Sequence, residues 1–502
     1  MTQLHDVANW QLAVLFSYFA VLILLSLYGC HRYLLVRLYR KYAAGDDPCA
    51  PGRFDDEQLP RVTVQLPLYN ERYVVERLIN AVCRLDYPTE RIEIQVLDDS
   101  TDDTTDRARQ LVDHWQRRGM NIELIHRTDR TGYKAGALQN GLAHTDSDFI
   151  AIFDADFIPK PDFLRRTIHH FTDDEIGMVQ ARWDYINRDY SLLTRAQAIL
   201  LDGHFVLEHT ARNRSGRFFN FNGTAGIWRR DAIADAGGWH HDTLTEDLDL
   251  SYRAQLEGWK FRYLRDLAVP SELPVEMTAF KNQQHRWSKG ALQTARKLLP
   301  RILRSDESPK IKLEAFYHLT GNVAYLLMVA LAVLMPLATL IRVQQQWYEI
   351  LLLDVPIFFG ATVSVSYFYW TAQRERGVSA FESLKMLPAV LALGIGMSVN
   401  NARGVLEAIV DYDSPFVRTP KYAIGRRDES WSSKLYIQKS TVLPAVEFAL
   451  GAWFSYAIWV IITDPGQPMA SLPFLVLFQC GFLYVALVSI RQSLHRPSPQ
   501  PG

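Results

Sequence analysis

Phe149-Ile-Ala-Ile-Phe-Asp-Ala-Asp156 decides the fold of this 502-residue chain. Its apolar run has the length of a buried strand and stops abruptly at two carboxylates, Asp154 and Asp156. Two carboxylates two positions apart at a strand end can hold a divalent metal. Because oxygen ligands and an open coordination shell suit Mg²⁺ or Mn²⁺ carrying a diphosphate, we expect a metal site of this kind here.

The segment before this stretch alternates predicted strands with predicted helices. We expect strands over residues 62–66, 92–97, 122–126 and 149–153, and helices over residues 70–85, 104–118 and 134–144. The alternation predicts parallel βαβ units in an α/β fold, with ligands at the carboxyl ends of the strands. Asp98 and Asp99 lie at the end of the second predicted strand, just as Asp154 and Asp156 lie at the end of the fourth. Asp is also common in turns and helix N-caps, so a local structural role stays open for either pair alone.

Two later motifs carry further candidate chemistry. Asp247, in Thr245-Glu-Asp247, is a candidate general base that deprotonates an acceptor hydroxyl. Gln283, Arg286 and Trp287 share one face if they lie on a helix. An Arg can neutralise a diphosphate leaving group, and a Trp face can stack on a sugar ring. The same helix can instead lie on a membrane with Trp and Arg as interface anchors, and the two interpretations are compatible.

Charge and cysteine content exclude some classes of protein. The chain carries 54 Lys and Arg against 55 Asp and Glu, whereas a nucleic-acid-binding protein usually has a basic excess. The four cysteines are scattered without a Cys-x-x-Cys pair, so the sequence predicts neither a disulfide framework nor a zinc site.

Apolar segments at both ends predict an integral, multi-pass membrane protein, which we place in a bacterial inner membrane. Residues 10–30 contain no charge and can span a bilayer, whereas a signal peptide would need basic residues before them. Basic residues follow this span, so the N-terminus is expected outside and the next domain in the cytoplasm. Four more spans are predicted over residues 316–341, 350–371, 442–462 and 472–490.

Residues 384–401 are apolar but broken by Lys385, Pro388 and glycines. Residues 403–439 are rich in Lys and Arg and should be cytoplasmic, which a full crossing at 384–401 would prevent. We therefore expect an interfacial or re-entrant segment there, five spans in all and a cytoplasmic C-terminus. The predicted organisation is a membrane segment over 1–42, a linker over 43–60, a soluble domain over 61–305 and a membrane region over 306–502.

The motifs together resemble the membrane-embedded family 2 glycosyltransferases of the cellulose synthase superfamily. The resemblance rests on Pro67-Leu-Tyr-Asn-Glu71, Asp98-Asp99, Lys134-Ala-Gly-Ala-Leu138, Asp154-x-Asp156, Thr245-Glu-Asp247 and Gln283-x-x-Arg286-Trp287. Asn222-Gly-Thr-Ala-Gly-Ile-Trp228, Ala236-Gly-Gly-Trp239, Gly258-Trp-Lys-Phe261 and Gln283–Ser288 favour the cellulose synthase-like A and C proteins, which make β-mannan, glucomannan or a β-glucan backbone. The match is strong over residues 60–300 and loose over the membrane half.

The resemblance implies a GT-A, Rossmann-like cytoplasmic domain between transmembrane helices, and it assigns roles to individual residues. The residues implied to contact the nucleotide sugar are Asn70, Glu71, Asp98 or Asp99, Lys134, Asp154 and Asp156, with Asp156 binding the metal. The residues implied on the acceptor side are Asp247 as base, Glu246 beside it and Trp287 as floor, while Gln283 and Arg286 face the donor.

Phe416-Val-Arg-Thr-Pro-Lys421, within a loop expected over 411–435, resembles the gating loop of cellulose synthase, Phe-x-Val-Thr-x-Lys. Arg418 stands where that pattern has Val, although Thr419 and Lys421 could still meet the diphosphate.

The implied activity is an inverting, metal-dependent β-glycosyl transfer from UDP-glucose or GDP-mannose that extends a glucan or mannan. One alternative is a glycosyltransferase that adds a single sugar to a membrane lipid. A transporter or scaffold with an inactive domain is disfavoured, because the acidic motifs and Arg286-Trp287 are all present.

Overall fold

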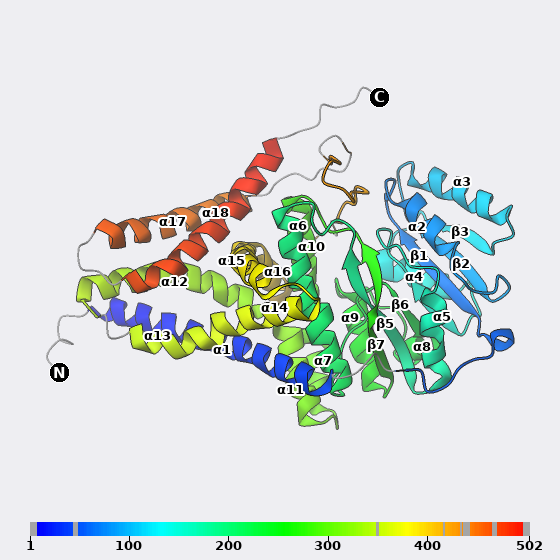
Figure 1. Cartoon of the computed structure of the whole chain (residues 1–502), viewed down its shortest axis with the longest axis horizontal. Coiled ribbons are helices and arrows are strands. Elements are labelled where there is room, and N and C mark those ends of the chain that lie inside the picture. Colours follow the sequence, from blue (N-terminus) through cyan, green and yellow to red (C-terminus); the bar gives the residue numbers. More distant parts are fainter. Residues whose placement is uncertain are drawn as a thin grey trace.

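The computed structural model describes residues 8–43, 49–347, 351–414, 417–431, 434, 442–463 and 469–494. A sheet with its covering helices forms one end of the molecule, and a bundle of long helices forms the other (Figure 1). α10, Met277–Arg304, lies between the two parts and contacts elements of both.

Seven strands form one mixed sheet in the order β3-β2-β1-β4-β6-β5-β7. Their bounds are β1 Val62–Leu68, β2 Ile92–Asp98, β3 Ile122–His126, β4 Phe149–Ile152, β5 Ile176–Tyr185, β6 Gly226–Arg229 and β7 Lys260–Ser271. β1 pairs in parallel with both β2 and β4, and β2 pairs in parallel with β3. The four predicted strands and their parallel pairing are therefore confirmed, with ends that differ by two residues at most.

The second half of the sheet was not predicted from the sequence. β6 runs antiparallel to β4 and to β5, and β5 pairs in parallel with β7. The short strand β6 directly follows the Asn222-Gly-Thr-Ala sequence, so it fixes that turn against the end of β4. The antiparallel strand therefore carries a second set of polar residues to the edge where Asp154 lies.

Helices cover both faces of the sheet and bury an apolar core against it. The helical elements of this part are η1 Asp56–Gln58, α2 Val75–Val82, α3 Thr104–Gln116, α4 Tyr133–Leu142, α5 Phe163–Thr167, η2 Ile168–Thr172, α6 Leu192–Asp202, the π-helix η3 Gly203–Glu208, α7 His209–Arg214, α8 Arg230–Asp235 and α9 Glu246–Leu256. α2 is shorter than the predicted helix over 70–85. Its start is delayed because Asn70 has a left-handed φ of 54°, which a right-handed helix does not accommodate.

The other end of the molecule is helical. Its elements are α1 Asn9–Tyr42, α11 Pro309–Thr320, α12 Val323–Gln345, α13 Leu351–Phe358, the π-helix η5 Phe359–Val363, α14 Ser364–Glu375, α15 Ala380–Gly396, α16 Ser398–Ile409, α17 Leu443–Thr463, η6 Met469–Ser471 and α18 Leu472–Leu494. Four of the described helices, α1, α12, α17 and α18, are long and apolar enough to cross a membrane. The bent pair α15 and α16, with a 41° angle between them, adds a broken span or a re-entrant loop.

Two predicted spans need correction. The span expected over 316–341 is interrupted at Gly321 and Asn322, so the apolar helix is α12 and the residues before it belong to α11. The span expected over 350–371 consists of three consecutive segments, α13, η5 and α14, and residue 350 lies outside the described residues. The segment over 384–401 contains the bend between α15 and α16, as a re-entrant segment would.

Glu447, which interrupts the apolar sequence of α17, is buried against α10. Its carboxylate accepts a hydrogen bond of 2.7 Å from Lys281 Nζ, and both side chains are buried. A charge in an apolar helix is tolerated when it is paired in this way. The pair joins α17 to the turn of α10 that precedes Gln283.

Candidate active site

A cavity of about 240 Å³ lies at the carboxyl ends of β1, β2 and β4. We call it the sheet-edge cavity. Of the site residues predicted from the sequence, those that line it are Glu71, Asp99, Lys134, Asp154, Asp156, Glu246, Asp247, Gln283, Arg286, Trp287, Thr419 and Lys421. These residues come from distant parts of the sequence, and the parallel strands bring them together because their ends share one edge of the sheet.

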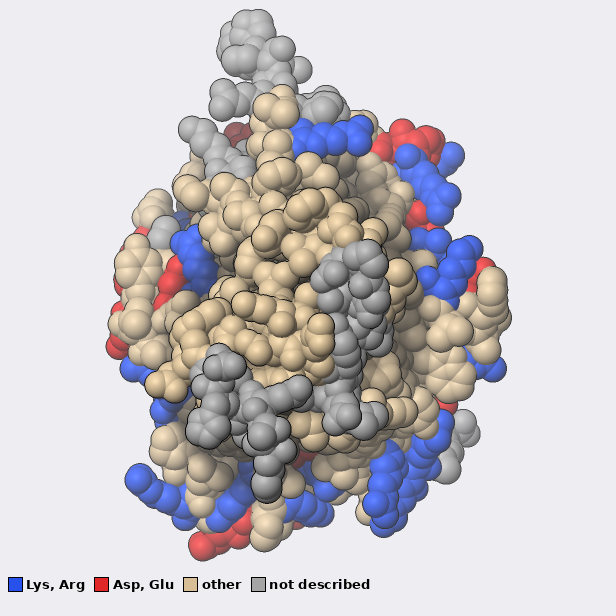
Figure 2. All heavy atoms as spheres, turned by 90° about the vertical axis from the view of Figure 1, so that its left-hand side faces the viewer, with Lys and Arg blue, Asp and Glu red and all other residues tan. Residues whose placement is uncertain are grey.

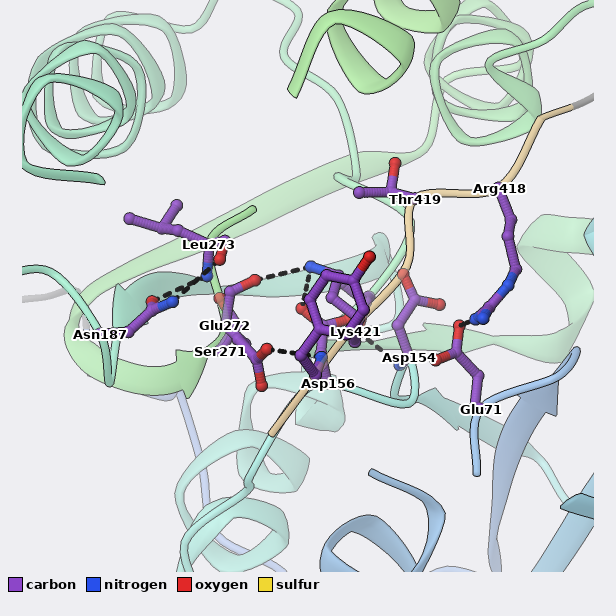
Figure 3. A network of polar contacts seen from close by, with 12 residues as sticks. Glu71, Asp154, Asp156, Asn187, Ser271, Glu272, Leu273, Arg418, Thr419 and Lys421 are labelled. Atoms are coloured by element: carbon purple, nitrogen blue, oxygen red, sulfur yellow. Dashed lines mark hydrogen bonds and ion pairs between the residues drawn. The ribbon is translucent and has the colours of Figure 1, made fainter. Parts of the chain in front are cut away.

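Each carboxylate of the Asp154-x-Asp156 motif is paired with a lysine. Lys134 Nζ lies 2.5 Å from Asp154 Oδ1 and donates to Gly223 O at 2.9 Å. Lys421 Nζ lies 2.7 Å from Asp156 Oδ2 and donates to Glu272 O at 2.6 Å (Figure 3). Burial acts to lower the pKa of Lys134, but the charges of Asp154 and Glu246 outweigh it and raise the pKa, so the ammonium group keeps its proton.

The donor set of this motif fits a hard divalent cation. Asp154 and Asp156 supply only oxygen atoms, line the same cavity and each attract a positive group. Mg²⁺ and Mn²⁺ prefer oxygen ligands and need few protein ligands when a diphosphate supplies the rest. The residues present are therefore compatible with the expected metal.

The segment Val417–Lys421 crosses the mouth of the sheet-edge cavity (Figure 3). Arg286, on α10, donates to Val417 O and, at 2.9 Å, to Thr419 Oγ1. The predicted helix face is confirmed, since Gln283, Arg286 and Trp287 all line the cavity from α10. Burial lowers the pKa of Arg286 to about 10, which still leaves the guanidinium charged at neutral pH. Phe416, the first residue of the loop motif, lies outside the described residues.

Arg418, the departure from the gating-loop pattern, forms an ion pair with Glu71. Arg418 NH1 lies 2.8 Å from Glu71 Oε1, and both side chains are largely buried (Figure 3). Burial raises the pKa of Glu71 to about 7, an effect that the Arg418 charge partly offsets. Arg418 and Lys421 therefore tie the loop to β1 and β4 through separate carboxylates.

Asp247 lies at the start of α9 and lines the sheet-edge cavity. Its Oδ1 accepts a hydrogen bond of 2.8 Å from the Leu248 backbone amide, and a Cβ at Gly223 would lie 3.2 Å from its Oδ2. Gly223 has a φ of +78°, so both space and backbone geometry favour glycine there. Burial raises the pKa of Asp247 to about 7, and the charge of Glu246 adds to this effect.

Asp98 and Asn70 are placed differently from the prediction, because neither lines the sheet-edge cavity. Asp98 is fully buried and accepts hydrogen bonds from Ser100 N, Thr105 Oγ1 and His126 Nδ1 at 3.0, 2.6 and 2.9 Å. Asn70 binds Thr101 through its side chain. Both residues stabilise the loop after β2, which leaves Asp99 as the member of the acidic pair that lines the cavity.

Several lining residues were not singled out in the sequence. Arg130 lies over the ring of Tyr69 at 3.3 Å and over Tyr133 at 4.9 Å, and both Arg130 and Tyr69 line the cavity. Glu272, at the end of β7, accepts from Tyr422 N at 2.8 Å and holds the loop in place. Arg130 stands four residues before Lys134, in a glycine-containing turn. Its proximity to the Lys134–Leu138 motif was the one feature of the sequence that could have indicated a place in the site.

A second cavity, of about 830 Å³, begins where the sheet-edge cavity ends. We call it the long cavity. The two cavities share the lining residues Trp183, Leu201, Asn222, Thr245, Asp247 and Trp287. The long cavity then follows α12, whose lining positions, with the residue before it, are Asn322, Ala324, Tyr325, Met328, Leu331, Met335, Thr339 and Arg342. From Asn322 to Arg342 a helix rises by about 30 Å, which matches the hydrocarbon thickness of a bilayer.

The wall of the long cavity near Asn222 carries buried polar groups. His204 lies 3.0 Å from Asn222 Nδ2 through Nε2 and 3.0 Å from Glu208 Oε2 through Nδ1. Glu208 is also ion-paired with Arg32 and Arg212. The π-helix η3 presents both His204 and Glu208 to the cavity. Burial lowers the pKa of His204 well below its usual value, so the imidazole is neutral, and its two ring nitrogens are used by the contacts with Glu208 and Asn222.

Comparison with known proteins finds matches to the part of the chain that contains the sheet. Residues 60–290 match the family model described as glycosyltransferase like family 2. The chain is 47% identical over 269 residues to glucomannan 4-beta-mannosyltransferase 1 of Oryza sativa subsp. japonica, which covers 52% of each chain. It is 48% identical over 266 residues to glucomannan 4-beta-mannosyltransferase 2 of Arabidopsis thaliana, covering 50% of this chain and 49% of the relative. The chain thus spans about half the length of the curated relatives that it matches.

A solved structure shares the fold. The mannosyltransferase PcManGT from Pyrobaculum calidifontis, in complex with GDP-Man and Mn2+, superposes with a TM-score of 0.51 at 19% identity, covering 80% of this chain and 99% of that one. At this identity the likeness establishes the fold alone. The expected GT-A, Rossmann-like α/β architecture is confirmed.

Proposed function

We propose that residues 60–290, which match the model of glycosyltransferase like family 2, form a glycosyltransferase domain, and that the chain is an inverting β-glycosyltransferase that extends a β-linked polysaccharide at a membrane. The observation that carries the proposal is the junction of the two cavities at Asp247 and Trp287. A donor in the sheet-edge cavity and an acceptor in the long cavity would meet at the candidate base.

GDP-mannose is the donor that we propose first, with UDP-glucose as the competitor. The curated relatives are glucomannan mannosyltransferases, and the solved structure with the same fold is described with GDP-Man and Mn2+. The base of the nucleotide would lie near Tyr69, Asp99 and Arg130, at the end of the sheet-edge cavity away from Asp247. The diphosphate would lie between Lys134, Arg286 and Lys421, which supply the positive charge that it requires.

The transfer follows from these positions. Asp247 accepts the proton of the acceptor hydroxyl, whose oxygen forms a bond to the anomeric carbon while the bond from that carbon to the diphosphate breaks. The diphosphate leaves with the electron pair, and Arg286 and Lys134 stabilise its charge. A single displacement inverts an α-linked donor into a β-linked product. Asp156, with Asp154 beside it, would hold Mg²⁺ or Mn²⁺, which neutralises diphosphate charge when bound.

The long cavity supports a polymer as the product. It follows α12 over about 30 Å, a length that accommodates several sugar units. Trp183 and Trp287 offer aromatic faces at its start, and the Glu208 carboxylate can accept hydrogen bonds from hydroxyl groups. The membrane helices would place the catalytic domain and the C-terminus in the cytoplasm and the far end of the cavity outside, with α15 and α16 as a broken or re-entrant segment.

Sugar incorporation by the purified chain in lipid vesicles tests the proposal. Radiolabelled GDP-mannose and UDP-glucose are supplied in turn with Mg²⁺ or Mn²⁺, and the products are separated by size and by solvent extraction. We expect a high-molecular-weight product from GDP-mannose that a β-mannanase degrades. A small, solvent-soluble labelled lipid would instead show transfer of a single sugar to a lipid acceptor, and the polymer proposal would be wrong.

A further inference from the structure

Arg342, near the C-terminal end of α12, and Asp354 form an ion pair that lines the long cavity, in which the Arg342 side chain is buried and that of Asp354 is half-buried. Arg342 NH1 donates to Asp354 Oδ2 at 2.7 Å, and both residues line the cavity. Within α12, all of which the structure describes, Arg342 is the one charged side chain. A charged pair inside an apolar helix bundle is costly and points to a function when it faces a cavity.

Aromatic and hydroxyl groups complete this cluster. Tyr18, on α1, lies 3.4 Å through its hydroxyl from Asp354 Oδ1, and the Arg342 guanidinium lies 5.0 Å from the Tyr18 ring centre. The Arg342 side chain is only 9% exposed, and its buried Nε atom has no hydrogen-bond partner among the described residues. A buried donor without a partner costs free energy unless a ligand satisfies it.

The end of the molecule that faces away from the sheet carries little charge at its centre. Figure 2 views the molecule from the end opposite the sheet, and among the described residues Lys, Arg, Asp and Glu appear around the rim while uncharged atoms occupy the centre. Arg342 stands in the last turn of α12, where a chain that follows α12 along the long cavity would leave the bundle.

We propose that Arg342, Asp354 and Tyr18 form a carbohydrate-binding subsite at the exit of the long cavity, which holds the growing neutral glycan between successive transfers. The inference rests on the proposed function, because it requires a polymer in the cavity. Asp354 accepts hydrogen bonds from sugar hydroxyls, Arg342 donates to ring or hydroxyl oxygens, and the Tyr18 ring presents an apolar face to the sugar. The ion pair of Arg342 and Asp354 suits a neutral glycan that binds and then moves along the cavity. When the glycan leaves, each charge is still compensated by the other.

A matched pair of double variants tests the subsite. Arg342→Met with Asp354→Leu removes the pair that lines the cavity, and Lys281→Met with Glu447→Leu removes a buried pair that lines neither cavity. Replacing a buried ion pair by apolar residues of similar size is often neutral for folding. The full-length proteins are reconstituted in vesicles with radiolabelled GDP-mannose and Mn²⁺. The length of the product and the initial rate of transfer to a short β-1,4-mannooligosaccharide are then measured.

We expect the Arg342 and Asp354 double variant to shorten the product about tenfold, the ratio that corresponds to the loss of roughly one charged hydrogen bond that retains the chain. Its initial rate should stay close to that of the unmodified chain, because the transfer occurs at Asp247. The control variant should keep the full product length. Asp354→Asn, which preserves shape and one acceptor, should give an intermediate length and covers the case in which the double variant does not fold.

Unchanged product length in the Arg342 and Asp354 variants would overturn the subsite and leave a structural pair that joins α12 to α13. Equal shortening in the control variant would also overturn it, because the effect would then come from any loss of charge in the bundle. If the unmodified chain makes no polymer, the proposed function is wrong and the subsite falls with it.

Discussion

The sheet-edge cavity and the long cavity meet at Asp247, yet they are built from opposite kinds of side chain. The smaller cavity is crowded with carboxylates and cations, whereas the part of the longer one along α12 is lined mainly by Leu, Met and Tyr. Fixed charges in a buried site stabilise a developing charge far better than they would in water. A path for a moving chain needs the reverse, because strong and closely spaced sites would hold the chain in place. The charged sheet-edge cavity is therefore suited to a chemical reaction, and the mainly apolar long cavity is suited to the movement of a chain.

The largest effect should come from the residue that both cavities share. Asp247→Asn removes the candidate base without changing its size, and we expect sugar transfer to fall by about 10²–10⁴-fold, the usual contribution of a general base. Nucleotide binding, measured by calorimetry, should be preserved. If binding is lost as well, Asp247 is a donor ligand or a structural residue. Trp183→Phe, at another shared position, should retain most activity because it keeps an aromatic face.

The next effect tests the charged chemistry of the sheet-edge cavity. Asp156→Asn should reduce transfer by at least about 100-fold, because a metal contributes several kcal/mol to stabilising a leaving group. Removal of divalent metal with EDTA should have the same effect on the unmodified chain, and Mn²⁺ should restore it. Calorimetric titration with Mn²⁺ and GDP provides a readout independent of turnover. An Asp156→Asn chain that keeps full activity in EDTA would show that no metal acts at this site.

The third prediction concerns the pH dependence of activity, which should depend on Asp247 and on its neighbour Glu246. Asp247 acts as a base only when deprotonated, and its pKa is about 7, so activity should fall roughly tenfold per pH unit as pH decreases below that value. Glu246→Gln removes a negative charge that raises the pKa of Asp247. The fall in activity on the acid side of the pH–activity profile, which we call the acid limb, should therefore move to lower pH. Glu71 also has a pKa of about 7. Glu71→Gln therefore serves as the control, since it should leave the position of the limb unchanged if Asp247 is responsible.

The smallest effect should come from the loop that covers the sheet-edge cavity. Arg418→Val restores the residue of the cellulose synthase pattern and removes the partner of Glu71. Glu71 can then take up a proton near neutral pH, which avoids most of the cost of an unpaired buried charge. We expect a loss of activity of only a few-fold, largest at alkaline pH, because loss of the Arg418 charge raises the pKa of Glu71 further and delays its ionisation. Arg418→Lys, which keeps the charge, should be closer to the unmodified chain. A loss comparable to that of Asp156→Asn would place Arg418 in contact with the donor.

Local sequence was enough for one half of the sheet. The strands that became β1 to β4 are short apolar runs bounded by polar turns, and their parallel order follows from the helices between them. β5, β6 and β7 lack such regular spacing, and β6 exists only because it pairs with strands remote in sequence. We could predict that most of the site residues would lie close together, because the carboxyl ends of parallel strands lie at the same edge of a sheet. The loop with Lys421 was connected to that edge only by resemblance to a family.

The treatment of Asp98 and Asp99 as equivalent could have been refined from the sequence. Successive residues of a strand point to opposite faces, so two adjacent aspartates cannot both face the same cavity. The structure assigns Asp98 to the protein interior and Asp99 to the cavity, where Arg127 binds both of its oxygens at 2.8 and 2.6 Å. By contrast, no local pattern could pair Glu447 with Lys281, because 166 residues separate them.

Under the proposed function, the Lys281–Glu447 pair would couple the rate of sugar transfer to the lipid environment. It joins α17, a candidate membrane-spanning helix, to the turn of α10 just before Gln283, Arg286 and Trp287. A helix longer or shorter than the local hydrocarbon layer adjusts by tilting. A tilt of α17 would be transmitted through this pair to the face of α10 that lines the sheet-edge cavity. The thickness of the surrounding bilayer is then a variable of the reaction rate, in the same way as temperature or pH.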